Sequence, residues 1–147
     1  MRFRTIHESH GQRTIVAILE TGDEVTESLL RLSREENITA AQITAIGAFE
    51  RAGLRYFDWG SKAYEDIPVR EQVEVASLLG DIGQDDSGGP ALHIHAVLGR
   101  RDGTAVAGHL ATGLVRPTLE VVLIESPEHL KRRHDPKTGL SLIQIET

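Results

Sequence analysis

Apolar residues in the first quarter of the chain form two patterns in succession. Residues 13–20 are rich in isoleucine and valine, which is typical of a buried strand. After a glycine, Val25, Leu29 and Leu32 follow spacings of four and three residues, and acidic residues just before them favour a helix amino terminus. The pattern therefore predicts a strand followed by a helix within residues 23–38.

The remaining sequence is typical of strands separated by short links. Glycines divide it into runs rich in isoleucine, valine, leucine and aromatic residues. Near the C-terminus, SPEHLKRRHDPKTGL predicts a short helical turn, with a break at Asp135-Pro136 before a last strand. The predicted strands cover residues 41–49, 53–59, 72–80, 91–98, 104–115, 118–125 and 140–145.

These elements predict an α+β fold with one main helix and a mainly antiparallel sheet. Consecutive strands joined by short links pair antiparallel, because parallel neighbours need a long crossover. The strands also carry more apolar side chains than one helix can cover, which indicates that another copy of the chain covers a second face. The residues counted in this surplus are Val73, Val75, Leu79, Val121 and Leu123.

Composition limits the class of protein. The chain has 147 residues, 39% of them hydrophobic, which predicts one domain over residues 1–147. The absence of cysteine excludes disulfides and thiolate metal sites. No apolar run suits a membrane span or a signal peptide, so we expect a cytoplasmic protein with no membrane partner. A net charge of -6 disfavours direct binding to nucleic acid.

Three of the seven histidines lie within ALHIHAVLGRRDGTAVAGHL, residues 91–110. His93 and His95 share one face of a predicted strand because side chains two residues apart point the same way. Asp102-Gly103 predicts a hairpin turn that returns His109 to a nearby strand. Three imidazoles with an open position predict a site for zinc or another divalent transition metal. The alternative is that these histidines only pack on the sheet or face solvent.

The same segment carries a resemblance to a known family. One stretch is similar to the centre of the plant-and-prokaryote conserved (PPC) domain: LGDIGQDDSGGPALHIHAVLGRRDGTAVAGHLATGLVRPTLEVVLIE. It shares with the domain a glycine-ended strand followed by L-H-x-H, a D-G turn, G-H-L and T-x-E-V-V. TGDEVTESLLRLSREENITAAQITAIGAFERAGLRYFD resembles the family's helix and the strands after it. The resemblance covers roughly residues 14–125 and leaves residues 126–147 as a C-terminal extension. Ala107 stands where many members have glycine.

The resemblance implies a trimeric PPC fold with a histidine metal site. In bacterial and archaeal members the metal site is similar to His93, His95 and His109 here. Glu120 matches the family's glutamate after threonine, so it is either a base or orienting group at the metal or an ordinary strand carboxylate. Plant members carry an AT-hook, R-G-R-P, before the domain, and this chain has no such motif.

Other conspicuous residues are interpreted without a catalytic role. The basic pairs and clusters at Arg100-Arg101 and residues 131–134 are expected to be solvated. We expect Glu74 and Ser77 to serve the sheet or an interface, and the aromatic run Tyr56, Phe57 and Trp59 to pack in the core or between subunits. His7 and His10 are expected before the first strand, and His129 and His134 in the C-terminal connection, all four at the surface.

Three classes of function follow from the sequence. The first is a homotrimeric, zinc-binding domain with room for a small-molecule ligand at the metal. The second is a metal-dependent enzyme acting on a small molecule, and the third is a DNA-associated or protein-interaction module like the AT-hook-linked relatives. No nucleophile motif, phosphate-binding loop or dinucleotide fingerprint identifies a substrate.

Overall fold

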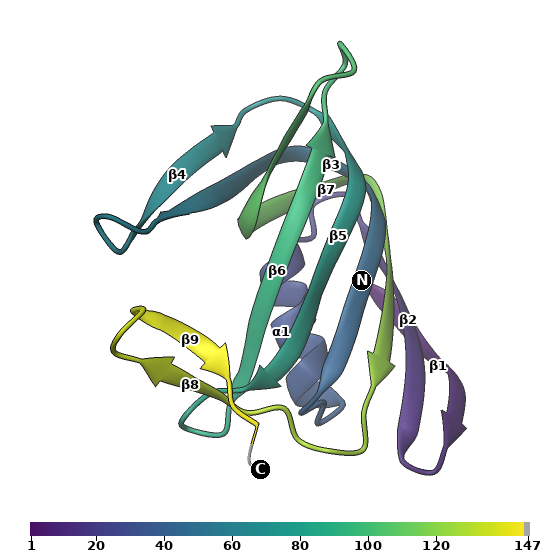
Figure 1. The fold of residues 1–147 in the computed structure, drawn as a ribbon. Helices are drawn as coiled ribbons and strands as arrows, with labels where there is room; N and C mark the ends of the chain where they lie inside the picture. Colours follow the sequence, from purple (N-terminus) through teal and green to yellow (C-terminus); the bar gives the residue numbers. More distant parts are fainter. Residues whose placement is uncertain (146–147) are drawn as a thin grey trace.

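The described residues, 1–145, form a curved seven-stranded antiparallel sheet, one α-helix and a small two-stranded sheet (Figure 1). This description comes from a computed structural model. The strand order of the large sheet is β1-β2-β7-β6-β5-β3-β4, and β7 also pairs with β3. The elements are β1 (Arg2–Ser9), β2 (Gln12–Glu20), α1 (Val25–Glu35), β3 (Ala41–Asp58), β4 (Ala63–Val69), β5 (Val73–Gln84), β6 (Pro90–Gly99), β7 (Ala105–Glu125), β8 (Arg132–Asp135) and β9 (Leu140–Ile143). The α+β class with a mainly antiparallel sheet is confirmed.

Four strands close a circuit around the core. β3 and β7 pair along most of their lengths, β5 pairs with the first half of β3, and β6 pairs with β5. The start of β7 then returns beside β6. β3 and β7 each change neighbours along their length, so the sheet curves back on itself. We call the face that packs against α1 the inner face and the opposite face the outer face.

The helix forms where the spacing of apolar residues predicts it. Val25, Leu29 and Leu32 are fully buried against the inner face of the sheet. The side chain of Glu24 caps the amino terminus by accepting a hydrogen bond from the backbone N–H of Glu27 at 2.8 Å. No helix of residues 1–145 is long and apolar enough to cross a membrane.

Two strands that were predicted as broken are continuous. β3 runs through Gly53, which pairs with both neighbouring strands. A Cβ atom there would lie 2.8 Å from Thr112 Oγ1, so the glycine allows close packing and does not end the strand. β7 runs through Pro117, where the register against β3 shifts between Phe49 and Gly47. A bulge therefore takes up the proline within one long strand.

The sequence pattern missed the most exposed elements. β1 and β4 were not predicted, because most of their side chains are exposed and show little alternation of apolar and polar residues. The predicted helical turn after residue 126 is wrong, since the segment contains a bend and then the β8–β9 hairpin. The last strand ends at residue 143 rather than 145.

The apolar residues of the outer face also differ from the expectation. Val73, Val75, Val121 and Leu123, expected to be surplus surface, are buried in the core. Leu79 is exposed as expected, and Ile46, Val97, Val122 and Ile124 join it as exposed apolar side chains of the large sheet. An apolar outer face is thus present, but it is built largely from other residues.

Candidate metal centre

Strand register places the histidines on the outer face of the sheet. His109 on β7 lies directly opposite His95 on β6, and on its other side directly opposite Arg55 on β3. Direct partners in antiparallel strands share a face. His93 lies two residues before His95 on β6 and is the partner of Asp81 on β5. The predicted turn at Asp102-Gly103 is present and produces this register.

The three imidazole rings converge. One nitrogen from each of His93, His95 and His109 lies within 4.8 Å of the others. The ring centroids are 5.1 to 5.3 Å apart. Three nitrogens at such spacing can approach a common point between the rings, which is the arrangement that a metal ion needs.

Two glycines permit this close approach of strands. A Cβ atom on Gly108 would lie 2.8 Å from the carbonyl oxygen of Arg55. A Cβ atom on Gly80 would lie 2.2 Å from the carbonyl oxygen of His93. Any larger residue at either position would push apart the strands that carry the histidines.

Burial keeps two of the rings neutral. Desolvation lowers the pKa of His109 from 6.5 to about 4, and the nearby His93, His95 and two arginines add to this effect. Desolvation also lowers the pKa of His93, with Arg132 and His95 contributing, while Asp81 opposes the shift. Neutral imidazole is the form that binds a metal.

His109 has an unsatisfied nitrogen. Its Nδ1 is buried and has no hydrogen-bond partner among the described residues. A buried polar atom without a partner costs free energy, so such atoms are rare in folded proteins. A metal ion between the rings would account for three imidazoles that face one another without hydrogen bonds between them. The donor set therefore fits a divalent transition metal.

A buried ion pair lies behind His93. Arg132 is 6% exposed and donates to both carboxylate oxygens of Asp81 at 2.8 Å and to the carbonyl oxygen of Ser141 at 3.0 Å. Its Nη2 also lies 3.1 Å from Nδ1 of His93. Arginine has only donors, so His93 Nδ1 accepts in this contact. The expectation that residues 131–134 are all solvated is wrong for Arg132, whose neighbours Lys131 and Arg133 are exposed.

A cavity of about 450 Å³ opens in front of the histidines. Its lining residues come from β3, β4, β6, β7 and the start of β9. Figure 1 shows the β3–β4 and β8–β9 hairpins extending on the same side of β6. The centroid of the Tyr64 ring lies 5.3 Å from the centroid of the His109 ring and 5.2 Å from that of the Phe57 ring. The residues lining the cavity are Arg55, Tyr56, Phe57, Tyr64, His93, His95, Ala107, Gly108, His109 and Leu140.

The aromatic run is not part of the core. Trp59 is 63% exposed at the end of the β3–β4 hairpin, and Tyr56 is also exposed. Phe57 is half-buried and contacts Trp59 edge to face. Tyr56 and Trp59 therefore do not pack in the core of the chain, and their packing between subunits stays a prediction. Tyr56 and Phe57 form part of the cavity wall.

The structure does not bring Glu120 to the histidine cluster. Glu120 is exposed much further along β7, opposite Ile46 and Ile18. It lines a separate apolar hollow with Leu79 and Val122 on the outer face of the sheet. Within one chain, the strand pairing places Asp81 directly opposite His93, which makes it the carboxylate nearest to the cluster, and no sequence motif marks it.

The other candidate residues lie apart from the cavity. Glu74 is exposed on β5, and Ser77 on the same strand is half-buried. His10 lies in the turn after β1 and His134 on β8, both exposed, as expected for surface histidines. His7 is exposed too, but it belongs to β1 and does not precede the first strand.

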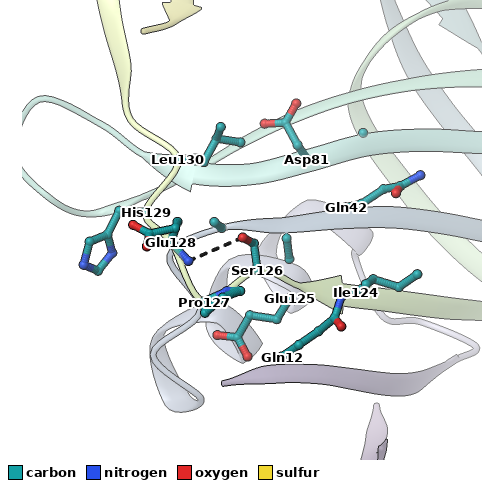
Figure 2. A pocket seen from close by; sticks show the side chains of 13 residues that line it. Gln12, Gln42, Asp81, Ile124, Glu125, Ser126, Pro127, Glu128, His129 and Leu130 are labelled. Carbon is teal, nitrogen blue, oxygen red and sulfur yellow. Dashed lines mark hydrogen bonds between the residues drawn. The ribbon is translucent and has the colours of Figure 1, made fainter. Parts of the chain in front are cut away.

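His129 lines a second cavity, of about 440 Å³, beside the C-terminal connection (Figure 2). Its Nδ1 lies 2.9 Å from Thr39 Oγ1. Glu125, which also lines this cavity, is paired with Arg13, and Asp81 is paired with Arg132. Glu125 and Asp81 thus already have partners, whereas Glu128 in the same view is an exposed carboxylate. His93, His95 and His109 form the one group of metal-binding side chains identified in residues 1–145.

Comparison with known proteins agrees with this fold. The sequence profile of the Plants and Prokaryotes Conserved domain matches residues 6–127. The chain belongs to this family. The matched region contains all three histidines of the cluster, and the β8–β9 hairpin follows it. Among curated proteins, none matches the chain.

Solved structures of similar sequence share the whole fold. A plant- and prokaryote-conserved protein of Pyrococcus horikoshii is 31% identical, with 92% of this chain and 93% of that chain covered and a TM-score of 0.84. A metal-containing protein of Archaeoglobus fulgidus is also 31% identical, with 99% of both chains covered and a TM-score of 0.83. A candidate DNA-binding protein of Bacteroides thetaiotaomicron is 28% identical, with coverages of 97% and 96% and a TM-score of 0.85.

Acid should destabilise the metal-free protein through the histidine cluster. Because the pKa of His109 is about 4 when folded and 6.5 in the unfolded reference, the unfolded chain binds more protons between these values. The free energy of unfolding should therefore fall as the pH is lowered from 6.5 to 4. Urea unfolding at several pH values measures this dependence, and His109→Gln should reduce it. An identical pH dependence in wild type and variant would contradict the assigned environment.

Proposed function

We propose that the protein is a homotrimeric metal-binding domain in which His93, His95 and His109 of each chain hold one divalent ion, most readily zinc. The observation that carries the proposal is the convergence of three imidazoles whose nitrogens lie within 4.8 Å. The low pKa of His109 and its unpartnered Nδ1 support it. The metal-containing relative from Archaeoglobus fulgidus supports the same assignment.

Three histidines leave an open position beside the cavity. When bound, the ion would supply Lewis-acid chemistry at that position. The chain's own residues would hold the ion, and Phe57, Tyr64 and Leu140 line one side of the cavity beside it. This room for a small molecule favours a metal-dependent enzyme as the second candidate function, although the cavity lining contains no carboxylate to act as a base.

Asp81 is the group placed to orient His93. Binding of a metal through Nε2 requires the proton of a neutral imidazole to lie on Nδ1. The Nδ1 atom of His93 lies 4.0 Å from Asp81 Oδ2, which is beyond hydrogen-bonding distance, so the ring or the carboxylate would have to shift before Asp81 could accept this proton. Metal binding therefore requires Arg132 to give up its contact with Nδ1 while keeping its bonds to Asp81 Oδ1 and Ser141.

The apolar outer face supports assembly into a trimer. Ile46, Leu79 and Val122 lie together around a shallow hollow of about 390 Å³. Exposed apolar patches on small proteins commonly mark contacts between subunits. Glu120 lines the same hollow, which supports a place for it in the proposed subunit contact rather than at the metal.

A function in direct DNA binding has less support. The candidate DNA-binding relative shares the fold, but this chain has a net charge of -6. Arg100 is paired with Glu71, and Arg132 is paired with Asp81. These basic residues are largely neutralised by partners and do not form a continuous phosphate-binding surface.

Metal content provides the first test. Protein purified without a histidine tag should bind about one zinc ion per chain at pH 7.5 and release it on acidification only below the ordinary imidazole pKa, because burial lowers the pKa values of His93 and His109 and so weakens proton competition. His95→Ala should lower zinc affinity by orders of magnitude, and the exposed His134→Ala should leave it unchanged. Competition with a chromophoric chelator measures both. Equal affinity in wild type and His95→Ala would place the site elsewhere.

Replacing the orienting carboxylate should weaken the site without abolishing it. Asp81→Asn should lower zinc affinity by about 10- to 100-fold, the usual effect of removing a group that positions a metal ligand. Asp86→Asn, in the exposed loop before β6, is the matched control and should have no effect. Unchanged affinity in Asp81→Asn, in protein shown to be folded by circular dichroism, would remove Asp81 from the account.

Light scattering tests the assembly. The wild-type mass should be three times the 16.1 kDa of one chain at micromolar concentration. Ile46→Glu should dissociate the trimer because it places a charge on the apolar outer face, where Ile46 is 60% exposed in the single chain. Ile6→Glu on β1, where the side chain is 61% exposed, should leave the mass unchanged. A monodisperse wild-type monomer would contradict the proposal.

Duplex DNA should not bind appreciably at about 150 mM salt, because the acidic surface repels phosphates. Fluorescence anisotropy with a labelled random duplex measures this. Micromolar or tighter binding that disappears on replacing the exposed Lys131 and Arg133 with glutamine would show that the C-terminal basic residues form a DNA-binding surface after all.

A further inference from the structure

The charge of the histidine cavity is the opposite of the charge of the whole protein. None of the side chains that line the cavity is acidic, and Arg55 is the one charged group among them. Imidazole binds a metal ion in its neutral form, so His93, His95 and His109 would add no charge of their own to the loaded site. A divalent cation held by three neutral imidazoles keeps its full charge, so the loaded cavity would carry a net positive charge on a protein of net charge -6.

A guanidinium group lies beside the open side of the cluster. Arg55 is the direct partner of His109 across β3 and β7, which places both side chains on the outer face. Its Nε donates to Asp66 Oδ1 at 2.9 Å, and the side chain is half exposed. Among the described residues no hydrogen bond occupies its two terminal nitrogens, which leaves that edge able to bind a planar carboxylate through two hydrogen bonds.

The rest of the wall is apolar and aromatic. Phe57 and Tyr64 contact each other edge to face beside His109, and Leu140 closes the side formed by the small hairpin. A volume of about 450 Å³ accepts a small organic molecule rather than a single inorganic ion. The lining offers one guanidinium group and no lysine, which suits a singly charged carboxylate better than a phosphate group.

We propose that this cavity binds a small organic carboxylate with an apolar body, whose charge is balanced by the bound metal and Arg55 and whose body packs on Phe57 and Tyr64. This inference rests on the proposed metal site. Asp66 competes for the same guanidinium group, because it is the partner of Arg55 across β3 and β4. Ligand binding therefore requires Arg55 to be shared between Asp66 and the incoming carboxylate.

Calorimetric titration of the zinc-loaded, full-length protein with benzoate and with its neutral analogue benzamide tests the inference at pH 7.5. Benzoate should bind at least about tenfold more tightly than benzamide, since only benzoate gains the charge-assisted hydrogen bonds. Arg55→Gln should remove about tenfold in benzoate affinity and little in benzamide affinity. Asp66→Asn should strengthen benzoate binding, because the competing carboxylate is gone.

The controls separate this inference from the metal site itself. Arg51→Gln, on the same strand but outside the cavity, should bind benzoate like the wild type. Zinc content is measured in every sample first, and failure of the wild type to bind zinc would overturn both proposals. Three results with zinc-loaded protein would overturn the carboxylate ligand alone. These are equal affinity for benzoate and benzamide, equal benzoate affinity in wild type and Arg55→Gln, and tighter binding of inorganic phosphate than of benzoate.

Discussion

The site depends on one constraint, the register of β7 against its two neighbours. His109 faces His95 on one side and Arg55 on the other, so a single strand position joins the histidine cluster to the charged and aromatic wall. A slip of one residue would turn His109 toward the core face. The turn at Asp102-Gly103 and the close approach allowed by Gly108 hold this register.

Burial then gives the cluster its chemistry. Partial desolvation keeps His109 and His93 in the neutral form that binds metals, at the cost of a buried nitrogen without a partner in the chain. The C-terminal hairpin contributes twice, through Arg132 behind His93 and through Leu140 in the cavity wall. The family match ends at residue 127, so the matched region supplies the histidines and the hairpin that follows it contributes to their surroundings.

The sequence revealed the features that depend on local rules. Alternation along β6 predicts that His93 and His95 share a face, and turn chemistry predicts the return of the chain toward His109. Arg55, Tyr64 and Asp81 could not be assigned, because they meet the cluster only through the pairing of distant strands. Burial of Arg132 between two exposed basic residues likewise depends on Asp81, fifty-one positions away in the chain.

X-ray absorption spectroscopy at the zinc edge tests the central claim most directly, because it counts the ligands around the bound ion. The account predicts three imidazole nitrogens at about 2.0–2.1 Å and one further light atom at the open position. In His95→Ala the spectrum of any remaining zinc should lose one imidazole. A shell of four imidazoles, a shell of oxygen atoms alone, or an unchanged spectrum in His95→Ala would contradict a site built by His93, His95 and His109.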